Sequence, residues 1–194
     1  MAGPERGAWE ALWAPYDEDT YQQALSFVPE GAVVLDIGAG DLRFARRLAA
    51  RARVVYAVER NRALLTGPVP ANVRVASADA RAWPFPADIE IAVLLMRHCT
   101  HFALYRRKLE ALGARRLITN ARWGMGVECI DLTALARPYG DVAAGWYACH
   151  CGATGFRSAP PETLLPRDLE GVHEVANCPE CNPNHYGRNS HCLP

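Results

Sequence analysis

The chain has 194 residues, half of them apolar, with equal numbers of basic and acidic side chains. This length accommodates one α/β domain with a small appendage, and the balanced charge argues against a protein that binds nucleic acid tightly through a broad basic surface. No apolar stretch approaches the roughly 20 residues of a membrane-spanning helix, and the first residues lack a secretion signal. We therefore expect a cytoplasmic protein that makes no membrane contact.

The segment before the first predicted strand has the pattern of an amphipathic helix. Residues 8–28 carry aromatic and aliphatic side chains among acids and glutamines, with Pro15 as a break. We expect this segment to cover the functional site that the following residues build.

The next segment predicts a buried strand that turns sharply into a helix. An apolar run over residues 33–37 ends at two closely spaced glycines, Gly38 and Gly40, and residues 42–48 then show helical periodicity. The glycines permit backbone conformations closed to other residues and let a ligand approach the main chain.

Further strand-like runs alternate with helical segments. The runs are continuously apolar rather than alternating, which is typical of parallel strands covered by helices on both faces. We therefore predict an α/β fold with a Rossmann-like, doubly wound, mostly parallel sheet, whose ligands bind at the carboxyl ends of the strands. The predicted strands cover residues 53–58, 73–76, 89–96 and 115–120, and residues 104–112 have helical spacing.

An acidic residue ends each of the first three predicted strands. These are Asp36, Glu59 and Asp79, and each interval between them fits one helix plus one strand. A carboxylate after the second strand can accept hydrogen bonds from both ribose hydroxyls, as in dinucleotide-binding folds. The carboxylate after the third strand can meet an adenine amino group.

In these residues the chain resembles the class I methyltransferases that use S-adenosylmethionine. The resemblance covers roughly residues 20–135 and lies in VVLDIGAGD, VVYAVERN and VRVASADA. It implies a seven-stranded, mostly parallel sheet, with the three motifs binding the methionine portion, the ribose and the adenine. The cofactor residues that this suggests are Asp36, Gly38, Gly40, Asp41, Glu59, Asp79 and Ala80.

A nicotinamide dinucleotide site is the nearest rival interpretation. That site expects a third glycine, which gives a pyrophosphate room, but Arg43 stands there and Asp41 adds negative charge. An acid beside the turn suits a cationic sulfonium better. The chain also departs from many methyltransferases, because Leu42 stands where they often have glycine.

The end of the fourth predicted strand is rich in reactive side chains. His98 or His101 is a candidate general base, and Cys99 is a candidate nucleophile if its thiolate is stabilised. Arg97 is a candidate for binding an anionic methyl acceptor. Asn120, which closes the fifth strand, is a candidate for hydrogen bonding to the acceptor. A buried thiol, a packed or helix-capping histidine and a turn asparagine are the structural alternatives.

The fourth strand lacks the motif of methyltransferases that modify exocyclic amino groups of bases or glutamine. That motif reads Asp/Asn-Pro-Pro-Tyr/Phe/Trp, whereas this chain has Met96-Arg97-His98-Cys99. Its absence disfavours that substrate class. Alignment of the attacking atom with the methyl carbon supplies much of the acceleration in such transfers, so a strong base is optional.

The chain has seven cysteines, and four of them form two close pairs near its end. Such thiolates can converge on one tetrahedral ion, and a closed shell of four sulfurs is structural. We predict a zinc-ribbon-like site, with unrelated thiols or a ligand swap to His150, His173, His185 or Cys192 as alternatives. The predicted zinc ligands are Cys149, Cys151, Cys178 and Cys181.

The amino-acid composition changes near residue 140, after which proline, glycine and cysteine become frequent. We predict a cofactor-binding domain over residues 1–140 and a zinc module over residues 141–194 packed on it. The leading hypothesis is a methyltransferase acting on a macromolecule, RNA before protein. The alternatives are a small-molecule O-, N- or S-methyltransferase and a binding protein without catalysis, and the sequence leaves the oligomeric state open.

Overall fold

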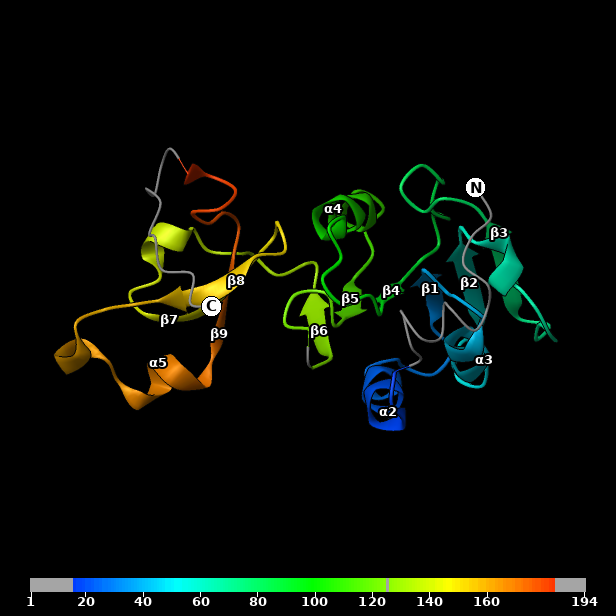
Figure 1. Ribbon diagram of the computed structural model, residues 1–194, viewed down its shortest axis with the longest axis horizontal. Coiled ribbons are helices and arrows are strands. Elements are labelled where there is room, and N and C mark those ends of the chain that lie inside the picture. Colours follow the sequence, from blue (N-terminus) through cyan, green and yellow to red (C-terminus); the bar gives the residue numbers. More distant parts are fainter. Residues whose placement is uncertain (1–15, 125, 184–194) are drawn as a thin grey trace. The chain divides into compact units, whose positions relative to one another are not determined.

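The computed structural model describes residues 16–124 and 126–183, and the chain divides into two compact units, residues 1–133 and 134–194. The first unit holds a six-stranded sheet in the order β3-β2-β1-β4-β5-β6, parallel except for the β5–β6 pair (Figure 1). The strands are β1 Val33–Ile37, β2 Val54–Glu59, β3 Val73–Ser77, β4 Ile91–Leu94, β5 Arg116–Thr119 and β6 Glu128–Asp131.

This sheet confirms the predicted Rossmann-like, mostly parallel fold. The chain crosses from β3 over β2 and β1 to β4, so the strand order reverses between β1 and β4, where such sheets bind their ligands. The resemblance implied seven strands, whereas the described residues of this unit form six.

Helices cover both faces of the sheet, as the continuously apolar strands require. The helices α2 (Glu18–Ser26) and α3 (Arg43–Ala49) pack on one face, and α4 (Phe102–Ala111) packs on the other (Figure 1). Successive strand residues point to opposite faces. Val34 and Val93 therefore join the core under α2 and α3, while Leu35 and Leu94 join the core under α4.

The second crossover differs from the prediction. Between β2 and β3 the chain forms only a short 3-10 helix, η1 (Arg62–Leu64), so the expectation of an α-helix between Glu59 and Asp79 is wrong. Gly67, Pro68 and Pro70 follow η1 directly, and prolines remove the donors that a helix needs. The next crossover, residues 78–90, is also described throughout and contains no α-helix.

The predicted N-terminal helix is shorter than its sequence pattern. Its residues 8–15 lie outside the described part of the chain, and α2 begins only after Asp17, whose carboxylate accepts a hydrogen bond of 2.7 Å from the amide of Thr20. This is an N-cap, which satisfies a donor that the first helical turn leaves open.

The second unit has a three-stranded sheet in the order β8-β7-β9, with β7 parallel to β9 and antiparallel to β8. Its core includes Tyr147 and Val175 together with two cysteines. Across the described residues of both units, no helix has the length and apolarity to cross a lipid bilayer. The elements are η2 Tyr139–Asp141, β7 Gly145–Cys149, β8 Thr154–Arg157, η3 Pro161–Thr163, α5 Pro166–Glu170 and β9 Val172–Val175.

Candidate functional site

The turn after β1 is built by left-handed backbone. Gly38 and Gly40 have φ of 75° and 54°, which a glycine adopts without strain. The amides of Gly38 and Ala39 both donate to the carbonyl of Val58, so the turn is fastened to the end of β2. A Cβ on Gly38 would lie 2.9 Å from Cε of Met96, which shows how closely the chain after β4 approaches this turn.

Leu42 keeps the same backbone conformation without being glycine. Its φ is 67°, and it is 1% exposed at the N-cap of α3. At this departure from the methyltransferase pattern, a leucine therefore adopts a backbone conformation that glycine adopts more easily. Burial of the leucine compensates for a conformation that costs about 1–2 kcal/mol outside glycine.

Asp36 lies on β1 directly before the turn and is 4% exposed. Burial and, to a smaller extent, the negative charge of Glu59 together raise its pKa to about 7. Among the described residues, its Oδ2 atom has no hydrogen-bond partner. A buried, unpaired carboxylate oxygen is unusual, and a ligand that donates a hydrogen bond or carries positive charge would satisfy it.

Glu59 connects the turn to the loop after β2. Its Oε2 accepts a hydrogen bond of 3.0 Å from the amide of Gly40, and its Oε1 accepts one of 2.7 Å from the amide of Asn61. The carboxylate is thus held at the carboxyl end of the sheet beside the glycine turn, with lone pairs left for a ligand. Asp36, Gly38, Gly40 and Glu59, four of the predicted cofactor residues, therefore lie together.

Asp41 has a different immediate role. Its carboxylate is 3% exposed and accepts hydrogen bonds from the amide and the guanidinium of Arg43, the shortest 2.6 Å. These bonds satisfy an orphan amide in the first turn of α3 and neutralise the charge that the sequence placed beside the turn. A contact between Asp41 and a cofactor stays a prediction.

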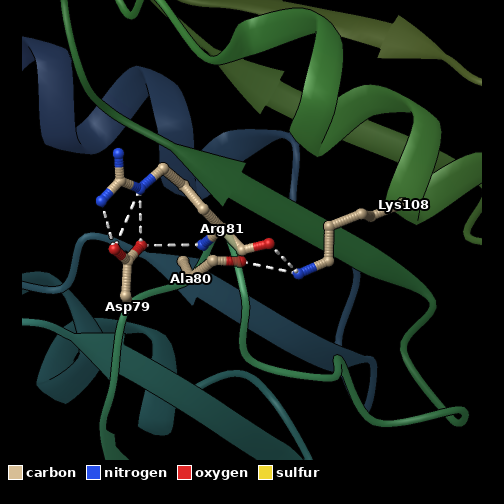
Figure 2. A network of polar contacts seen from close by, with 4 residues as sticks. All are labelled: Asp79, Ala80, Arg81 and Lys108. Atoms are coloured by element: carbon tan, nitrogen blue, oxygen red, sulfur yellow. Dashed lines mark hydrogen bonds and ion pairs between the residues drawn. The ribbon is translucent and has the colours of Figure 1, made fainter.

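Asp79 follows β3 and is held by its neighbour. Its carboxylate accepts hydrogen bonds from the amide and the side chain of Arg81, which keep its pKa well below the usual range (Figure 2). Asp79 is therefore ionised at every physiological pH. Ala80, the other predicted adenine contact, is buried beside it.

The chain after β4 is mostly exposed. His98 has left-handed backbone with φ of 56°, and its ring lies against Gly124, where a Cβ would come within 3.0 Å of Cε1. His101 is exposed at the N-cap of α4. Burial raises the pKa of Cys99, so the structure does not provide the thiolate stabilisation that a nucleophile needs.

Asn120 closes β5 and is 2% exposed, and its Oδ1 has no hydrogen-bond partner in the described part of the chain. In the chain after β4, the amide of Arg97 donates a hydrogen bond of 3.2 Å to the hydroxyl of Tyr16. The guanidinium of Arg97 lies 4.8 Å from the centre of the same tyrosine ring. The start of α2 thus reaches the end of β4, where the N-terminal cover was expected.

Sequence reasoning missed the residues that shape these loops from a distance. Met96 behind Gly38, Gly124 beside His98 and the guanidinium of Arg81 on Asp79 carry no motif of their own. Only the contact of Arg81 could have been predicted from the sequence, because a basic side chain two positions after an acid at a strand end can form an ion pair with that acid.

The second unit brings the four predicted metal ligands together. Their sulfur atoms all lie within 4.8 Å of one another, and three of the sulfur–sulfur distances are 3.7–3.8 Å. Zinc with sulfur ligands at roughly 2.3 Å places neighbouring sulfurs about 3.8 Å apart, so the spacing fits a tetrahedral ion. The cluster comprises Cys149, Cys151, Cys178 and Cys181.

The strand topology explains this convergence. Because β7 and β9 are parallel, with Cys149 opposite Val175, both cysteine pairs leave the sheet at the same edge. The amide of Cys178 also donates to the sulfur of Cys181 at 3.3 Å. Among the described residues His150 and His173 are not members of the cluster, and His185 and Cys192 lie outside the described part of the chain.

Comparison with known proteins finds similarity in structure alone. No family model matches the sequence, and no curated relative matches it. In structure, the chain is similar to S-adenosylmethionine-dependent methyltransferases. The matched region spans about half the length of several of these solved structures.

Three solved structures illustrate the similarity. Precorrin 8w decarboxylase from Methanobacterium thermoautotrophicum has 24% identity and a TM-score of 0.44, over 54% of this chain and 63% of that protein. The 23S rRNA methyltransferase ErmE has 21% identity and a TM-score of 0.46, over 54% and 46%. Phosphoethanolamine N-methyltransferase 1 from Haemonchus contortus, in complex with S-adenosylhomocysteine, has 18% identity and a TM-score of 0.43, over 53% and 25%.

Proposed function

We propose that the chain is an S-adenosylmethionine-dependent methyltransferase that acts on a macromolecule, RNA before protein. The observation that carries this proposal is the convergence of two carboxylates on the glycine turn. Asp36 offers a buried oxygen without a partner, and Glu59 is fixed by the amide of Gly40 at the end of the next strand.

The residues present fit this cofactor. Its ammonium group matches the unpaired oxygen of Asp36, and a ribose with two hydroxyls matches the oriented carboxylate of Glu59. Asp79, kept ionised by Arg81, offers an acceptor to the adenine amino group. The cofactor supplies the activated methyl group, and the chain binds it, aligns the acceptor and excludes water.

Exposed arginines at the carboxyl edge support a polyanionic acceptor. Arg60, Arg62 and Arg97 follow the ends of β2 and β4, and each has an exposed side chain. The carboxyl ends of parallel strands share one edge of the sheet, so these cations lie at the same edge as the proposed site, whereas its acids are buried or hydrogen-bonded. Phosphates of RNA suit such a rim.

The acceptor side remains a set of candidates. His98 and His101 are the candidate general bases, and Asn120 offers its unpaired oxygen to a donor on the acceptor. Cys99 has no stabilised thiolate in this structure, which makes it the weakest candidate of the four.

We also propose that the cysteine cluster of the second unit binds one structural zinc ion. The sulfur spacing and the closed set of four ligands support this role. A closed shell leaves no position for substrate, so the ion would stabilise the fold, and recognition of a macromolecule would belong to the surface around it.

Calorimetric titration with S-adenosylhomocysteine tests the cofactor site. We expect Glu59→Ala to lower its affinity about 100-fold, because charge-assisted hydrogen bonds to the ribose are lost. Glu90→Ala is the matched control, since Glu90 also accepts a backbone hydrogen bond, from Val33, but precedes β4 at the opposite end of the sheet. Absence of binding to the unmodified protein, or unchanged affinity in Glu59→Ala, contradicts the proposal.

Transfer of a labelled methyl group from the cofactor into fractionated cell extract tests the acceptor. We expect label in the RNA fraction. Label in protein alone or in small metabolites alone would overturn the RNA assignment while leaving the methyltransferase assignment intact.

A further inference from the structure

One cation from another part of the chain contacts the crossover between β3 and β4 at several points. Residues 78–90 contain no helix, and the chain turns tightly directly after Asp79, where the amides of Ala82 and Trp83 donate to the carbonyl of Asp79. Such a turn leaves its later carbonyls without partners inside the loop. Their partner comes from α4, on a different part of the chain.

Lys108 of α4 supplies that partner. Its ammonium donates to the carbonyls of Ala80 at 2.7 Å and Arg81 at 3.4 Å (Figure 2). It also donates to the carbonyl of Trp83 at 2.6 Å, so there is one carbonyl for each of its three hydrogens. It also lies 3.8 Å from the centre of the Phe85 ring, a cation–π contact. One side chain thus contacts four residues of the loop.

The Lys108 side chain is partly buried. Burial lowers the pKa of Lys108, and the nearby charge of Asp79 acts in the opposite direction. Charged hydrogen bonds in partly buried surroundings are stronger than those in water, so the loop conformation depends on this contact. No other lysine occurs in the chain, so no second amine can replace it.

The clamped loop includes the residues proposed to contact adenine. Asp79 begins the turn and Ala80 follows it, so the position of the carboxylate and of the Ala80 amide depends on the carbonyls that Lys108 holds. An ionised carboxylate has about four lone-pair sites, and Arg81 already engages it through three donor nitrogens. The Asp79 carboxylate therefore has few acceptor sites left, and a ligand can reach them only if the carboxylate is correctly positioned.

We infer that Lys108 is a positioning residue for adenine recognition, an inference that rests on the proposed cofactor site. It does not touch the cofactor. It fixes the loop so that Asp79 accepts from the 6-amino group while the amide of Ala80 donates to the adenine ring. The consequence is selectivity for adenine over a base with oxygen at that position.

Titration with two ligands tests this role. The ligands are S-adenosylhomocysteine and S-inosylhomocysteine, in which oxygen replaces the 6-amino group. We expect the unmodified protein to prefer the adenosyl ligand at least about tenfold, and Lys108→Met to lose most of that preference, since an unpaired donor or acceptor typically costs such a factor. Lys108→Arg should retain part of it.

Arg107→Met is the matched control, because it removes one exposed positive charge from the neighbouring position of α4. It should keep the preference. A merely structural role of Lys108 would weaken both ligands equally and leave their ratio unchanged, and that result would overturn the inference alone. Absence of binding of either ligand to the unmodified protein would overturn the proposed cofactor site, and this role with it.

A measurement on the unmodified protein covers the case in which Lys108→Met fails to fold. Amine acylation followed by peptide mass spectrometry reports on Lys108 alone among side chains, because it is the only lysine. Saturating S-adenosylhomocysteine should slow its acylation, since a ligand bound to the clamped loop stabilises that conformation. An unchanged rate under saturation contradicts the inference.

Discussion

The two compact units reach stability in different ways. The first has an apolar core on each face of its sheet, whereas the described core of the second is a single small cluster that includes Cys149 and Cys178. The first unit also contains every described non-glycine residue with positive φ, Leu42 and His98, and the buried, raised-pKa Asp36. Extensive burial allows the first unit to hold strained and unpaired groups at its strand ends, whereas the second would depend on coordination of the proposed ion.

Removal of a metal ligand should have the largest effect. We expect Cys178→Ser to lose the metal and unfold residues 134–194, because structural zinc contributes on the order of 10 kcal/mol to such modules. Amides of β7 and β9 should lose protection from hydrogen exchange while those of β1 and β4 keep it. Metal analysis by mass spectrometry gives the ion content.

Cys129→Ser is the matched control for that experiment, since Cys129 lies on β6 in the first unit. It should retain one equivalent of zinc. Full metal retention in Cys178→Ser would contradict the ligand assignment, and loss of protection in both units would contradict the difference drawn between them.

The charge of Asp36 should give the next largest effect. Its folded pKa of about 7 lies above the ordinary 3.8, so the folded protein binds the extra proton and loses stability as pH rises between these values. The full loss is on the order of 4 kcal/mol above pH 7. Asp36→Asn does not titrate, so the variant should gain relative to the unmodified protein from pH 4 to pH 8.

Urea unfolding across this range measures the difference. Cofactor affinity should show the opposite preference, since an ammonium group favours ionised Asp36 and binding to the unmodified protein should strengthen as pH rises through 7. A stability difference independent of pH would show that Asp36 is ionised in the fold without penalty.

Truncation of a core side chain in the first unit should have the third largest effect on stability. Leu117 of β5 is fully buried under α4, and Leu117→Ala should lower the free energy of unfolding by about 3 kcal/mol. Zinc content should stay at one equivalent, because the cluster lies in the other unit. Concurrent loss of metal would mean that the two units do not stabilise themselves separately.

The sequence predicted the parts of the site that follow from strand order. Asp36, Glu59 and Asp79 lie at the ends of β1, β2 and β3 because acids interrupt apolar runs there, and the cysteine pairs converge because they follow strands. Their roles as ligands of a cofactor or an ion stay predictions.

Prediction from the sequence was wrong where apolar residues or the spacing between motifs did not reflect a strand or a helix. The apolar run over 89–96 predicted a longer strand than β4, because Leu95 and Met96 pack against the core although they lie beyond the end of the strand. The spacing of Glu59 and Asp79 fitted a helix, but Pro68 and Pro70 prevent one. The clamp by Lys108 joins residues far apart in sequence, which no local pattern reveals.

The backbone of His98 should give the smallest effect. Left-handed backbone is tolerated by asparagine and poorly by β-branched residues, so His98→Asn should change the free energy of unfolding by less than about 0.5 kcal/mol and His98→Val should lower it by about 2 kcal/mol. At His101, with φ of −106°, the same pair of substitutions should differ little. Equal stability of the two His98 variants would show that this backbone carries no strain. Because His98→Asn removes the imidazole without disturbing the fold, its effect on the rate of labelled-methyl transfer isolates any acid–base role of this side chain.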